Sequence, residues 1–506
     1  MSLLPALPVL VPLSAAALSF AAWKRLAVQQ AIGVAGTGGL LAAGVALLAK
    51  TAGGAVLVLP VGGWPARFGI ALAADTLSAI MVLLAGLMGL AVAVYALADV
   101  DRPRKAFGFY PFLHLMLAGV AGSFVTADMF NMYVWFEVML LGSFVLLALG
   151  GERDQMAGAM KYVTLNLIGS ALFLSAAGVL YAVTKTLNMG EVSTRLALIA
   201  GHHPHLVLAL GALFLTSFAI KAGLFPFTFW LPASYATPPV AVSAVFAGLL
   251  TKVGVYALLR TFTVVFPVME RNFRILLLLA GITMVLGVLG AVSRFEIRKI
   301  LSFHIISQIG YMVAALGLSI SPDPEIRRLA LAGAVFYIAH HIVVKTNLFL
   351  VGGVIRRLTG SFDLKRTGGL AKSAPWLAVL FLIPALSLAG VPPLSGFWAK
   401  LMVIRAGLSA GEWLLVAAAI AAGLLTLISM VKIWNEAFWK PAPSPAPHPR
   451  PGRGTLLAMT APIAVLALVT VLIGLWPQPL LDVAGRAADQ LLDPAGWAKA
   501  VAGDLR

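Results

Sequence analysis

The stretch Leu206-Val-Leu-Ala-Leu-Gly-Ala-Leu-Phe-Leu-Thr-Ser-Phe-Ala-Ile-Lys221-Ala-Gly-Leu-Phe-Pro226 decides the fold class of this chain. The run is long and apolar enough to cross a bilayer as a helix, yet it ends in a lysine and in a glycine and proline that break a helix. Three more charged residues lie in runs of the same kind: Glu137 in Asn131–Gly150, Lys252 in Val240–Leu259 and Lys400 in Ser395–Ala406. A charged side chain at mid-bilayer costs about 3 to 15 kcal/mol, so it usually faces a partner or a water-filled path. We therefore expect an ion or proton path in a membrane.

The composition places the whole chain in the same class. Of its 506 residues, 61% are apolar and 11% are charged, and the mean hydropathy is strongly positive, unlike any soluble globular domain. We expect an all-α polytopic membrane protein with about fourteen transmembrane helices. The expected spans are Leu3–Ala21, Ala31–Leu48, Leu77–Ala96, Tyr110–Val125, Asn131–Gly150, Tyr162–Val183, Leu206–Gly223, Val240–Leu259, Ile275–Val292, Ile300–Leu318, Leu329–Val354, Trp376–Gly390 continuing through Ser395–Ala406, Trp413–Trp434 and Leu456–Trp476.

The formal charge of +17 does not indicate a nucleic-acid partner, because the Lys and Arg residues are spread through short loops without an aromatic-basic face. The positive-inside rule explains them better if the amino terminus faces outward. The inward loops then hold Lys24–Arg25, Arg102–Lys105, Arg294–Lys299, Arg356–Arg357 with Lys365–Arg366, and Lys440–Arg453. We expect a multi-pass protein of a bacterial cell membrane, surrounded by lipids.

Several classes of chemistry are excluded or disfavoured. Cysteine is absent, which excludes disulfides, thiolate-bound iron–sulfur clusters and thiol catalysis in this chain. Met1–Ala21 is interpreted as a first span and not as a cleaved signal, since the first positive charge follows the apolar stretch. The tract Gly201-His-His-Pro-His205 lies in a short outward loop without carboxylates, so we expect no metal site and no cofactor.

An internal repeat divides the chain. Ala222–Pro226 resembles Ala389–Pro393, and Ala247–Thr251 resembles Ala422–Thr426 in the same order. Each copy would hold about five spans, an odd number, so the copies would be inverted across the membrane. The predicted divisions are helices 1–3 in 1–106, a first repeat in 107–265, a second in 266–440, a Pro-rich linker in 441–454, and a last helix with a tail in 455–506. Helix breaks are predicted at Gly223 and Pro226, and at Pro392, Pro393 and Gly396.

The buried charges lie close to these breaks. Lys221 precedes the first break and Lys400 follows the second, so both lie beside unwound backbone that can hold water. Glu137 is the one carboxylate deep in any expected span. The alternatives are a structural ion pair for Glu137 and snorkelling to the interface for Lys221 or Lys400. Lys252 lies near the middle of its span, where snorkelling reaches poorly.

A second polar cluster contains histidines. His341 and Lys345 are four residues apart, hence on one helix face, and could pass protons between them. His340 points about a hundred degrees away and is expected to bond a neighbouring helix. His304 is followed by Ser307 and Gln308, a polar face that could carry water. For each histidine, a hydrogen bond that only packs two helices is the alternative.

Together these residues resemble a known family. The motifs are Phe130-Asn-Met-Tyr-Val-Trp-Phe-Glu137-Val-Met-Leu, Lys221-Ala-Gly-Leu-Phe-Pro-Phe, Leu250-Thr-Lys252-Val-Gly-Val-Tyr, Arg298-Lys-Ile-Leu-Ser-Phe-His-Ile-Ile-Ser-Gln-Ile-Gly-Tyr311 and His341-x3-Lys345-x2-Leu-Phe. They are similar to those of the antiporter-like subunits shared by respiratory complex I, membrane-bound hydrogenases and Mrp-type cation/proton antiporters. Within this family, the D-type subunits of Mrp antiporters are the most similar.

The resemblance implies a subunit of a secondary transporter and not an enzyme, working with the other subunits of a hetero-oligomer. It implies two inverted five-helix repeats, Glu137 as the carboxylate partner of Lys221, Lys252 as the central relay, His341 with Lys345 as the link, and Lys400 on the second broken helix. The chain departs from the M-type relatives of complex I, which carry glutamate at the position of Lys400. The long lateral helix of the L type is not expected, since the chain ends soon after Trp476. His304 replaces a small polar residue, which leaves its role open.

The expected function is a proton-translocating subunit of an Na⁺ or K⁺/H⁺ antiporter. A lysine without water favours its neutral form, and a carboxylate at about 4 Å restores the charged form by roughly 4 kcal/mol at an effective dielectric near 20. The alternatives are a proton-pumping membrane subunit of complex I or of an energy-converting hydrogenase, and a scaffold that transports nothing. The metal cation is expected in a sister subunit, because a lone carboxylate among lysines is a poor site for it.

Overall fold

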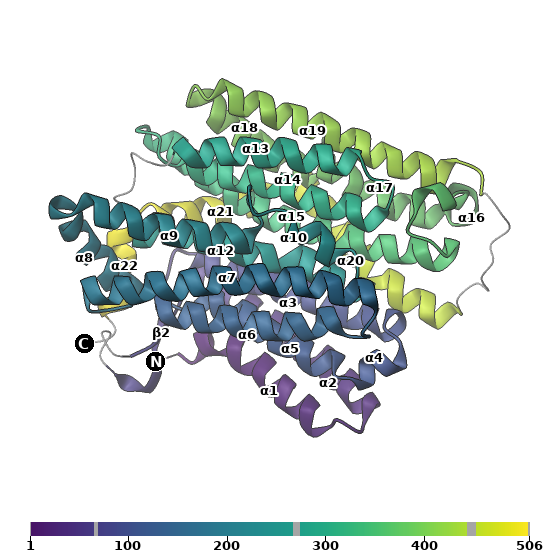
Figure 1. The fold of residues 1–506 in the computed structure, drawn as a ribbon, viewed down its shortest axis with the longest axis horizontal. Helices are drawn as coiled ribbons and strands as arrows, with labels where there is room; N and C mark the ends of the chain where they lie inside the picture. The colour runs from purple at the N-terminus through teal and green to yellow at the C-terminus, as the bar shows by residue number, and fades with distance from the viewer. Residues whose placement is uncertain (1, 65–68, 267–273, 443–451, 504–506) are drawn as a thin grey trace.

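The chain folds into a bundle of long helices that lie side by side along one axis, as the computed structural model shows (Figure 1). The structure describes residues 2–64, 69–266, 274–442 and 452–503. In these ranges, twelve helices are long and apolar enough to cross a membrane by length and composition, and Phe109–Val125 and Pro375–Ala389 are shorter apolar helices. Every expected span has a helix, so the prediction of an all-α polytopic membrane protein is confirmed.

The first half of the chain supplies several long helices, a hairpin and the first broken helix, α9. The β-hairpin pairs Leu57 with Ala74 in antiparallel register. The elements are α1 (Leu7–Ala21), α2 (Leu26–Thr51), β1 (Leu57–Pro60), β2 (Ala71–Ala74), α3 (Thr76–Asp99), α4 (Arg102–Ala106), α5 (Phe109–Val125), α6 (Met129–Ala148), α7 (Arg153–Thr184), α8 (Met189–His202), α9 (Pro204–Ala222) and α10 (Trp230–Tyr235).

One continuous helix at the centre of the bundle then contains two π-helical turns. It consists of α11 (Val240–Val245), the π-helical turn η3 (Phe246–Leu250), α12 (Thr251–Arg260) and the π-helical turn η4 (Thr261–Val265). Its most apolar window is entirely buried inside the chain. A π-helical turn displaces backbone carbonyls from their usual partners, which makes them available to side chains.

The second half of the chain surrounds the other side of this central helix. Its elements are α13 (Arg274–Val292), α14 (Ile297–Leu318), α15 (Pro324–Thr359), α16 (Leu370–Ser373), α17 (Pro375–Ala389), α18 (Ser395–Ser409), α19 (Trp413–Ile433) with the π-helical turn η7 (Trp434–Trp439), α20 (Arg453–Leu475), α21 (Gln478–Leu491) and α22 (Pro494–Gly503). The expected Pro-rich linker, 441–454, lies mostly at 443–451, outside the described residues.

The two predicted helix breaks are present and have the same local form. Helix α9 ends at Gly223 with φ 74°, and α17 ends at Gly390 with φ 91°, a left-handed conformation that glycine adopts without strain. At both helix ends, the backbone amide of the residue after the glycine donates a hydrogen bond to the carbonyl five residues earlier, as in a Schellman motif. The two broken helices begin at opposite ends of the bundle and therefore run in opposite directions (Figure 1). The repeat boundaries at 107–265 and 266–440 stay a prediction.

The two ends of the bundle differ in content. Both termini, the hairpin, α8, α21 and α22 gather at one end, which we call the terminal end (Figure 1). The opposite end carries α4 and α16 and the connections that hold Lys24–Arg25, Arg102–Lys105 and Arg294–Lys299, so we call it the basic end. The hairpin and helices α8, α21 and α22 were not expected from hydropathy. They are too short or too polar to span a bilayer, and α21 buries one apolar face through Ala484, Ala488 and Leu491.

Candidate functional site

The first buried charge pair is bridged by a serine. Ser170 of α7 donates a hydrogen bond to the Glu137 carboxylate of α6, and Lys221 Nζ donates to Ser170 Oγ over 3.0 Å. Lys221 is 4% exposed and its ammonium lies 4.9 Å from the ring centre of Phe136. No direct Glu137–Lys221 ion pair occurs in the described part of the chain, so their Coulomb energy is below the roughly 4 kcal/mol expected for contact at 4 Å. The expected pairing is thus indirect, and the hydroxyl between the two charges can pass a proton.

Helix α12 crosses α9 directly at Lys221. Gly254 makes this crossing possible, because a Cβ there would lie 2.6 Å from the backbone nitrogen of Ala222 and 2.9 Å from the carbonyl carbon of Lys221. Lys252, half a turn earlier on α12, is fully buried. Its Nζ donates to the Ala247 carbonyl in the π-helical turn η3 and, over 3.2 Å, to Thr251 Oγ1. A charged ammonium at this position is therefore held by backbone and hydroxyl oxygens alone.

The same central helix crosses α15 at the histidine cluster. A Cβ at Gly248 would lie 2.3 Å from Thr346 Oγ1, so only glycine allows η3 to approach α15 this closely. Lys345 is fully buried and donates to the Leu301 carbonyl of α14 over 3.0 Å. His341 is equally buried, and neither ring nitrogen has a hydrogen-bond partner among the described residues. No hydrogen bond joins His341 and Lys345 in the described residues, and both lie within electrostatic range of Lys252.

His304 and His340 occupy different environments. His340 Nδ1 lies 2.8 Å from Ser395 Oγ of α18, so it bonds a neighbouring helix as predicted from its direction on α15. Ser395 in turn lies 2.9 Å from Ser387 Oγ, which accepts the Gly396 amide at the second break. His304 is fully buried and both of its ring nitrogens lack partners within the described ranges. Ser307, expected on a watery face, donates to the Met284 carbonyl and holds α13 to α14.

Lys400 is the buried lysine at the second broken helix. Its Nζ donates over 2.7 Å to the Ala389 carbonyl, at the C-terminal end of α17 where the helix dipole is negative. The ammonium lies 5.3 Å from the ring centre of Tyr311. Gly390 leaves room for the stem, because a Cβ there would lie 2.8 Å from Lys400 Cδ. Lys400 is 7% exposed, so it does not snorkel out of the bundle.

Sequence reasoning found the charges but missed most of their partners. Ser170, Tyr337, Ser387 and Ser395 join the predicted residues, and Tyr337 donates its hydroxyl hydrogen to Gln308. Serine in an apolar helix usually bonds its own backbone, so its residue type carries no signal for Ser170. His202, in the histidine tract, lies at the end of α8 near the Leu198 carbonyl. Within the described residues no three His, Asp or Glu side chains are grouped as metal ligands.

The geometry is thus a row of buried polar side chains across the membrane-spanning region. It passes from the half-buried Glu137 through Ser170 to Lys221, then to Lys252 and Lys345 at the two close helix crossings. No ion pair in the described residues involves any of these lysines. A row of single protonatable groups without fixed counter-charges suits proton transfer.

Comparisons with known proteins agree with this geometry. Residues 126–426 match the family described as NADH:quinone oxidoreductase/Mrp antiporter, transmembrane. The chain is 42% identical to the D-type subunit of the Na⁺/H⁺ antiporter of Alkalihalophilus pseudofirmus over 98% of each chain.

Two solved structures are similar over almost the whole length. A chain of the Mrp complex from Dietzia sp. DQ12-45-1b superposes with a TM-score of 0.90 at 34% identity, covering 99% of this chain and 100% of that one. A chain of respiratory complex I from Thermus thermophilus superposes with a TM-score of 0.80 at 25% identity, covering 96% and 99%.

Proposed function

Because the chain belongs to the family of membrane subunits that NADH:quinone oxidoreductases and Mrp antiporters share, we propose that it moves protons within a multi-subunit Na⁺ or K⁺/H⁺ antiporter. It is a subunit of a secondary transporter and not an enzyme. The observation that carries the proposal is the bridged contact Glu137–Ser170–Lys221, which ends in a row of buried lysines. The 42% identity to a D-type antiporter subunit over 98% of each chain favours this function over a redox-driven pump.

The proposed mechanism is electrostatic. Glu137 stabilises a proton on Lys221 through Ser170, so moving or protonating Glu137 releases the Lys221 proton toward Lys252. The proton then passes to Lys345 and His341, and leaves by Lys400. A membrane potential contributes about 2.3 kcal/mol per charge per 100 mV, which is comparable to the energy of such a switch.

The metal cation is proposed to cross in a sister subunit. Na⁺ prefers several oxygen ligands and is repelled by cations. Here the carbonyls of Ala247, Leu301 and Ala389 already accept hydrogen bonds from Lys252, Lys345 and Lys400. Among the described residues from Lys221 to Lys400, Glu137 is the one carboxylate in contact with the row, so this part of the row conducts protons only.

The orientation of the chain is part of the same proposal. Lysine and arginine concentrate in the connections at the basic end. By the positive-inside rule this end faces the cytoplasm of a bacterial cell, and the terminal end with both termini faces outward.

The test is transport by the whole complex in inverted vesicles from a host without its own antiporters. Glu137→Ala and Lys221→Ala are each expected to abolish Na⁺- or K⁺-dependent dissipation of a pH gradient while the complex still assembles. Lys161→Ala, which removes an exposed lysine of α7, is the matched control and keeps wild-type activity. Near-normal transport in Glu137→Ala or Lys221→Ala would refute the scheme. Redox-driven acidification that needs Lys221, without any cation response, would assign the chain to a respiratory or hydrogenase complex.

A further inference from the structure

A second polar network lies at the terminal end, on the same helix face as Lys252. Lys252, Tyr256 and Arg260 follow at four-residue spacing on α12, so their side chains point in one direction along the helix. Tyr256 donates its hydroxyl hydrogen to the Phe124 carbonyl over 2.7 Å and accepts a hydrogen bond from Arg260 Nη2 over 3.2 Å. This face therefore continues the row of buried polar groups from the centre of the bundle toward the terminal end.

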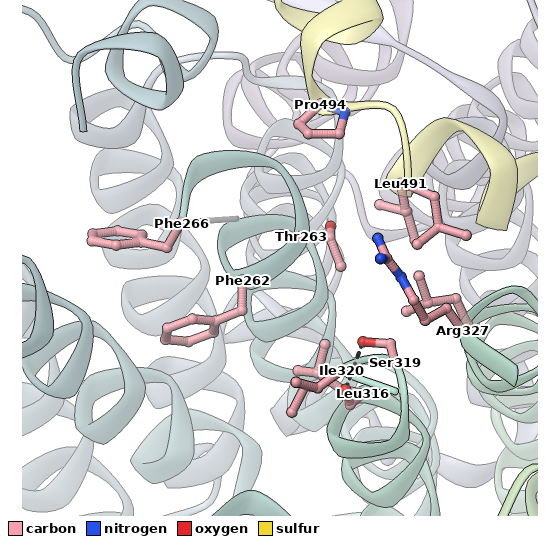
Figure 2. A pocket seen from close by; sticks show the side chains of 11 residues that line it. Phe262, Thr263, Phe266, Leu316, Ser319, Ile320, Arg327, Leu491 and Pro494 are labelled. Carbon is pink, nitrogen blue, oxygen red and sulfur yellow. Dashed lines mark hydrogen bonds between the residues drawn. The ribbon is translucent and has the colours of Figure 1, made fainter. Parts of the chain in front are cut away.

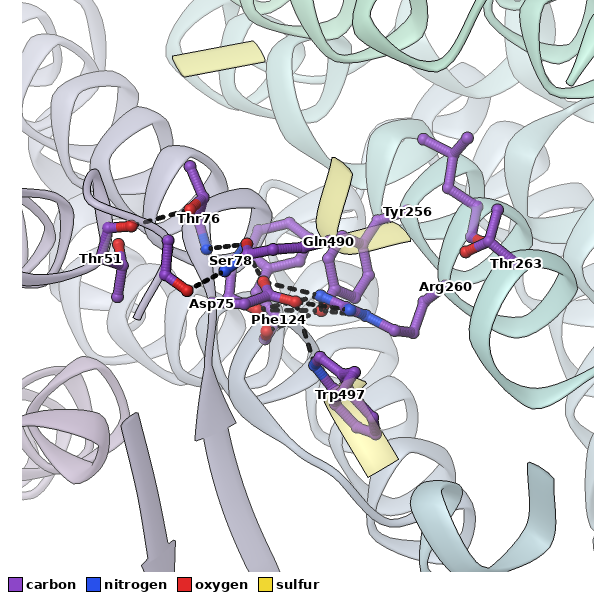
Figure 3. A network of polar contacts seen from close by, with 12 residues as sticks. Thr51, Asp75, Thr76, Ser78, Phe124, Tyr256, Arg260, Thr263, Gln490 and Trp497 are labelled. Atoms are coloured by element: carbon purple, nitrogen blue, oxygen red, sulfur yellow. Dashed lines mark hydrogen bonds and ion pairs between the residues drawn. The ribbon is translucent and has the colours of Figure 1, made fainter. Parts of the chain in front are cut away.

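Arg260 ends this face in a buried ion pair with Asp75. Its Nη2 donates to Asp75 Oδ1 over 2.8 Å, and its Nη1 lies 2.6 Å from Asp75 Oδ2 (Figure 3). Both residues are 1% exposed. Burial by itself would raise the pKa of Asp75, but the Arg260 guanidinium holds it below its usual value. A buried ion pair seldom stabilises a fold more than apolar side chains of the same volume, so stability alone does not explain this pair.

The C-terminal helices cover the pair with a single tryptophan. Trp497 of α22 donates its indole N–H to Asp75 Oδ2 over 3.1 Å, and its ring centre lies 5.3 Å from the Arg260 guanidinium carbon (Figure 3). Helices α21 and α22 together form this cover. Gln490 of α21 holds it in place by accepting a hydrogen bond from the Thr76 amide over 3.0 Å. The cover thus touches the ion pair and the first turn of α3 through specific hydrogen bonds.

The cover is flanked by two hollows. One of about 490 Å³ is lined by Trp497 and Gln490 and does not include Asp75 or Arg260, so Trp497 is the wall between this hollow and the ion pair. Another of about 200 Å³ lies between η4 and the α21–α22 connection, lined by Thr263, Arg327 and Leu491 (Figure 2). On the side of the larger hollow, space that can hold water therefore comes within one side chain, Trp497, of the pair.

We propose that Asp75, Arg260 and Trp497 form a gate between Lys252 and the terminal-end surface. In the closed state seen here, Trp497 holds Asp75 against Arg260 and keeps water away from Tyr256. When the cover moves, the pair opens to the hollow, and protons exchange between the surface and Lys252 along the Tyr256 face. Arg260 and Trp497 are positioning residues in this device. The inference rests on the proposed proton route through Lys252.

The test measures proton leak in vesicles that hold the whole complex without Na⁺ or K⁺. Trp497→Phe keeps an aromatic ring but loses the hydrogen bond to Asp75, and Trp497→Ala loses both. Loss of a hydrogen bond to a charged group shifts a closed–open equilibrium by about tenfold or more, so Trp497→Ala is expected to speed the collapse of a pH gradient by about that factor. Trp476→Ala, at a tryptophan that is 71% exposed, is the control and leaves the leak unchanged.

The double variant Trp497→Ala/Lys252→Ala decides the route, and its leak is expected to return to the wild-type rate. A leak that does not need Lys252, or no leak from an assembled Trp497→Ala complex, overturns the gate. Lys221→Ala, assayed for antiport in parallel, separates this result from the proposed function. If Lys221→Ala is inactive while the Trp497 variants do not leak, only the gate fails; if Lys221→Ala is active, the transport scheme itself fails.

If the Trp497 variants do not assemble, a second measurement tests the gate. The chain has no cysteine, so Ser78→Cys places a single thiol beside the gate, where Ser78 Oγ lies 3.2 Å from the Tyr256 hydroxyl. A membrane-impermeant thiol reagent applied at the terminal end is expected to label this thiol during turnover and not at rest. Equal protection in both conditions overturns the proposal.

Discussion

At the scale of the residue, the function depends on which oxygen each buried ammonium contacts. Lys221 alone reaches a carboxylate through one side chain, whereas Lys252, Lys345 and Lys400 reach backbone carbonyls. A backbone carbonyl is a fixed dipole and cannot accept the proton, so it holds the charged lysine without competing for its proton. Lys221 is therefore the one lysine of the row whose charge a neighbouring carboxylate can switch.

Ser170 is predicted to be essential because it joins Glu137 to Lys221. Ser170→Ala removes a hydrogen bond to each charged group and is expected to lower antiport about tenfold or more. Ser170→Thr keeps the hydroxyl and should retain most of the activity. The measurement is cation-dependent collapse of the pH gradient at equal amounts of assembled complex.

The control for this prediction is Ser175→Ala on the same helix. Ser175 is exposed, so its loss leaves transport unchanged. Full activity in Ser170→Ala would mean that Glu137 acts on Lys221 directly or through water.

At the scale of the element, two helix breaks and one π-helical turn position the row. The first break ends α9 directly after Lys221, the second supplies the Ala389 carbonyl to Lys400, and η3 supplies the Ala247 carbonyl to Lys252. Carbonyls at helix ends are not all bonded within the helix, so the end of α17 offers an acceptor to Lys400. Irregular backbone at membrane depth is stable only where the surrounding protein satisfies it, which is the case at these three places.

The second break is predicted to depend on Gly396. A Cβ at this position would lie 1.8 Å from the Ser387 carbonyl oxygen, which belongs to rigid helical backbone. Gly396→Ala should therefore destabilise the junction of α17 and α18 by about 1–3 kcal/mol or more. The expected result is a lower thermal denaturation midpoint of the purified complex.

Gly178→Ala in α7 is the matched control, because a Cβ there meets no atom within 4 Å. An unchanged midpoint in Gly396→Ala would mean that α17 and α18 can move apart at little cost in free energy. The junction would then be less rigid than its contacts indicate.

At the scale of the whole molecule, the position of Glu137 indicates a neighbouring subunit. Glu137 is only half-buried, and it lies on an exposed face of α6 with Phe130 at 45%, Val134 at 36% and Leu141 at 57% exposure. A carboxylate that faced lipid at this depth would cost several kcal/mol. Because similar chains occur in a multi-subunit Mrp complex, we expect a sister subunit to cover this face.

A photo-crosslinking amino acid in place of Leu141 tests this expectation. In the assembled complex it should join this chain to a sister subunit, detected as a band of higher mass. The same substitution at Leu146, which is fully buried on the same helix, should give crosslinks within the chain only. Adducts with lipid alone at position 141 would contradict the prediction.

The sequence by itself determined the spans, the two breaks and the identity of Glu137 and the buried lysines of the row, but not the buried pair Asp75 and Arg260. Hydropathy and helix breaking are properties of short segments, so they can be read without knowing what packs nearby. The same reasoning located Lys221 and Lys400 beside the breaks, and the structure has them there.

Only the tertiary structure decided the partners. Ser170 lies 51 residues from Lys221 in the chain, and Asp75 lies 185 residues from Arg260. The C-terminal segment, expected as a tail, became helices α21 and α22 over the terminal end because their apolar faces find buried positions there. A hydrogen-bond partner is set by where helices cross, and the crossings at Gly254 and Gly248 follow from packing of residues far apart in the chain. Local sequence carries no record of that packing, which is the physical reason why Glu137 and the lysines of the row were predicted and their contacts were not.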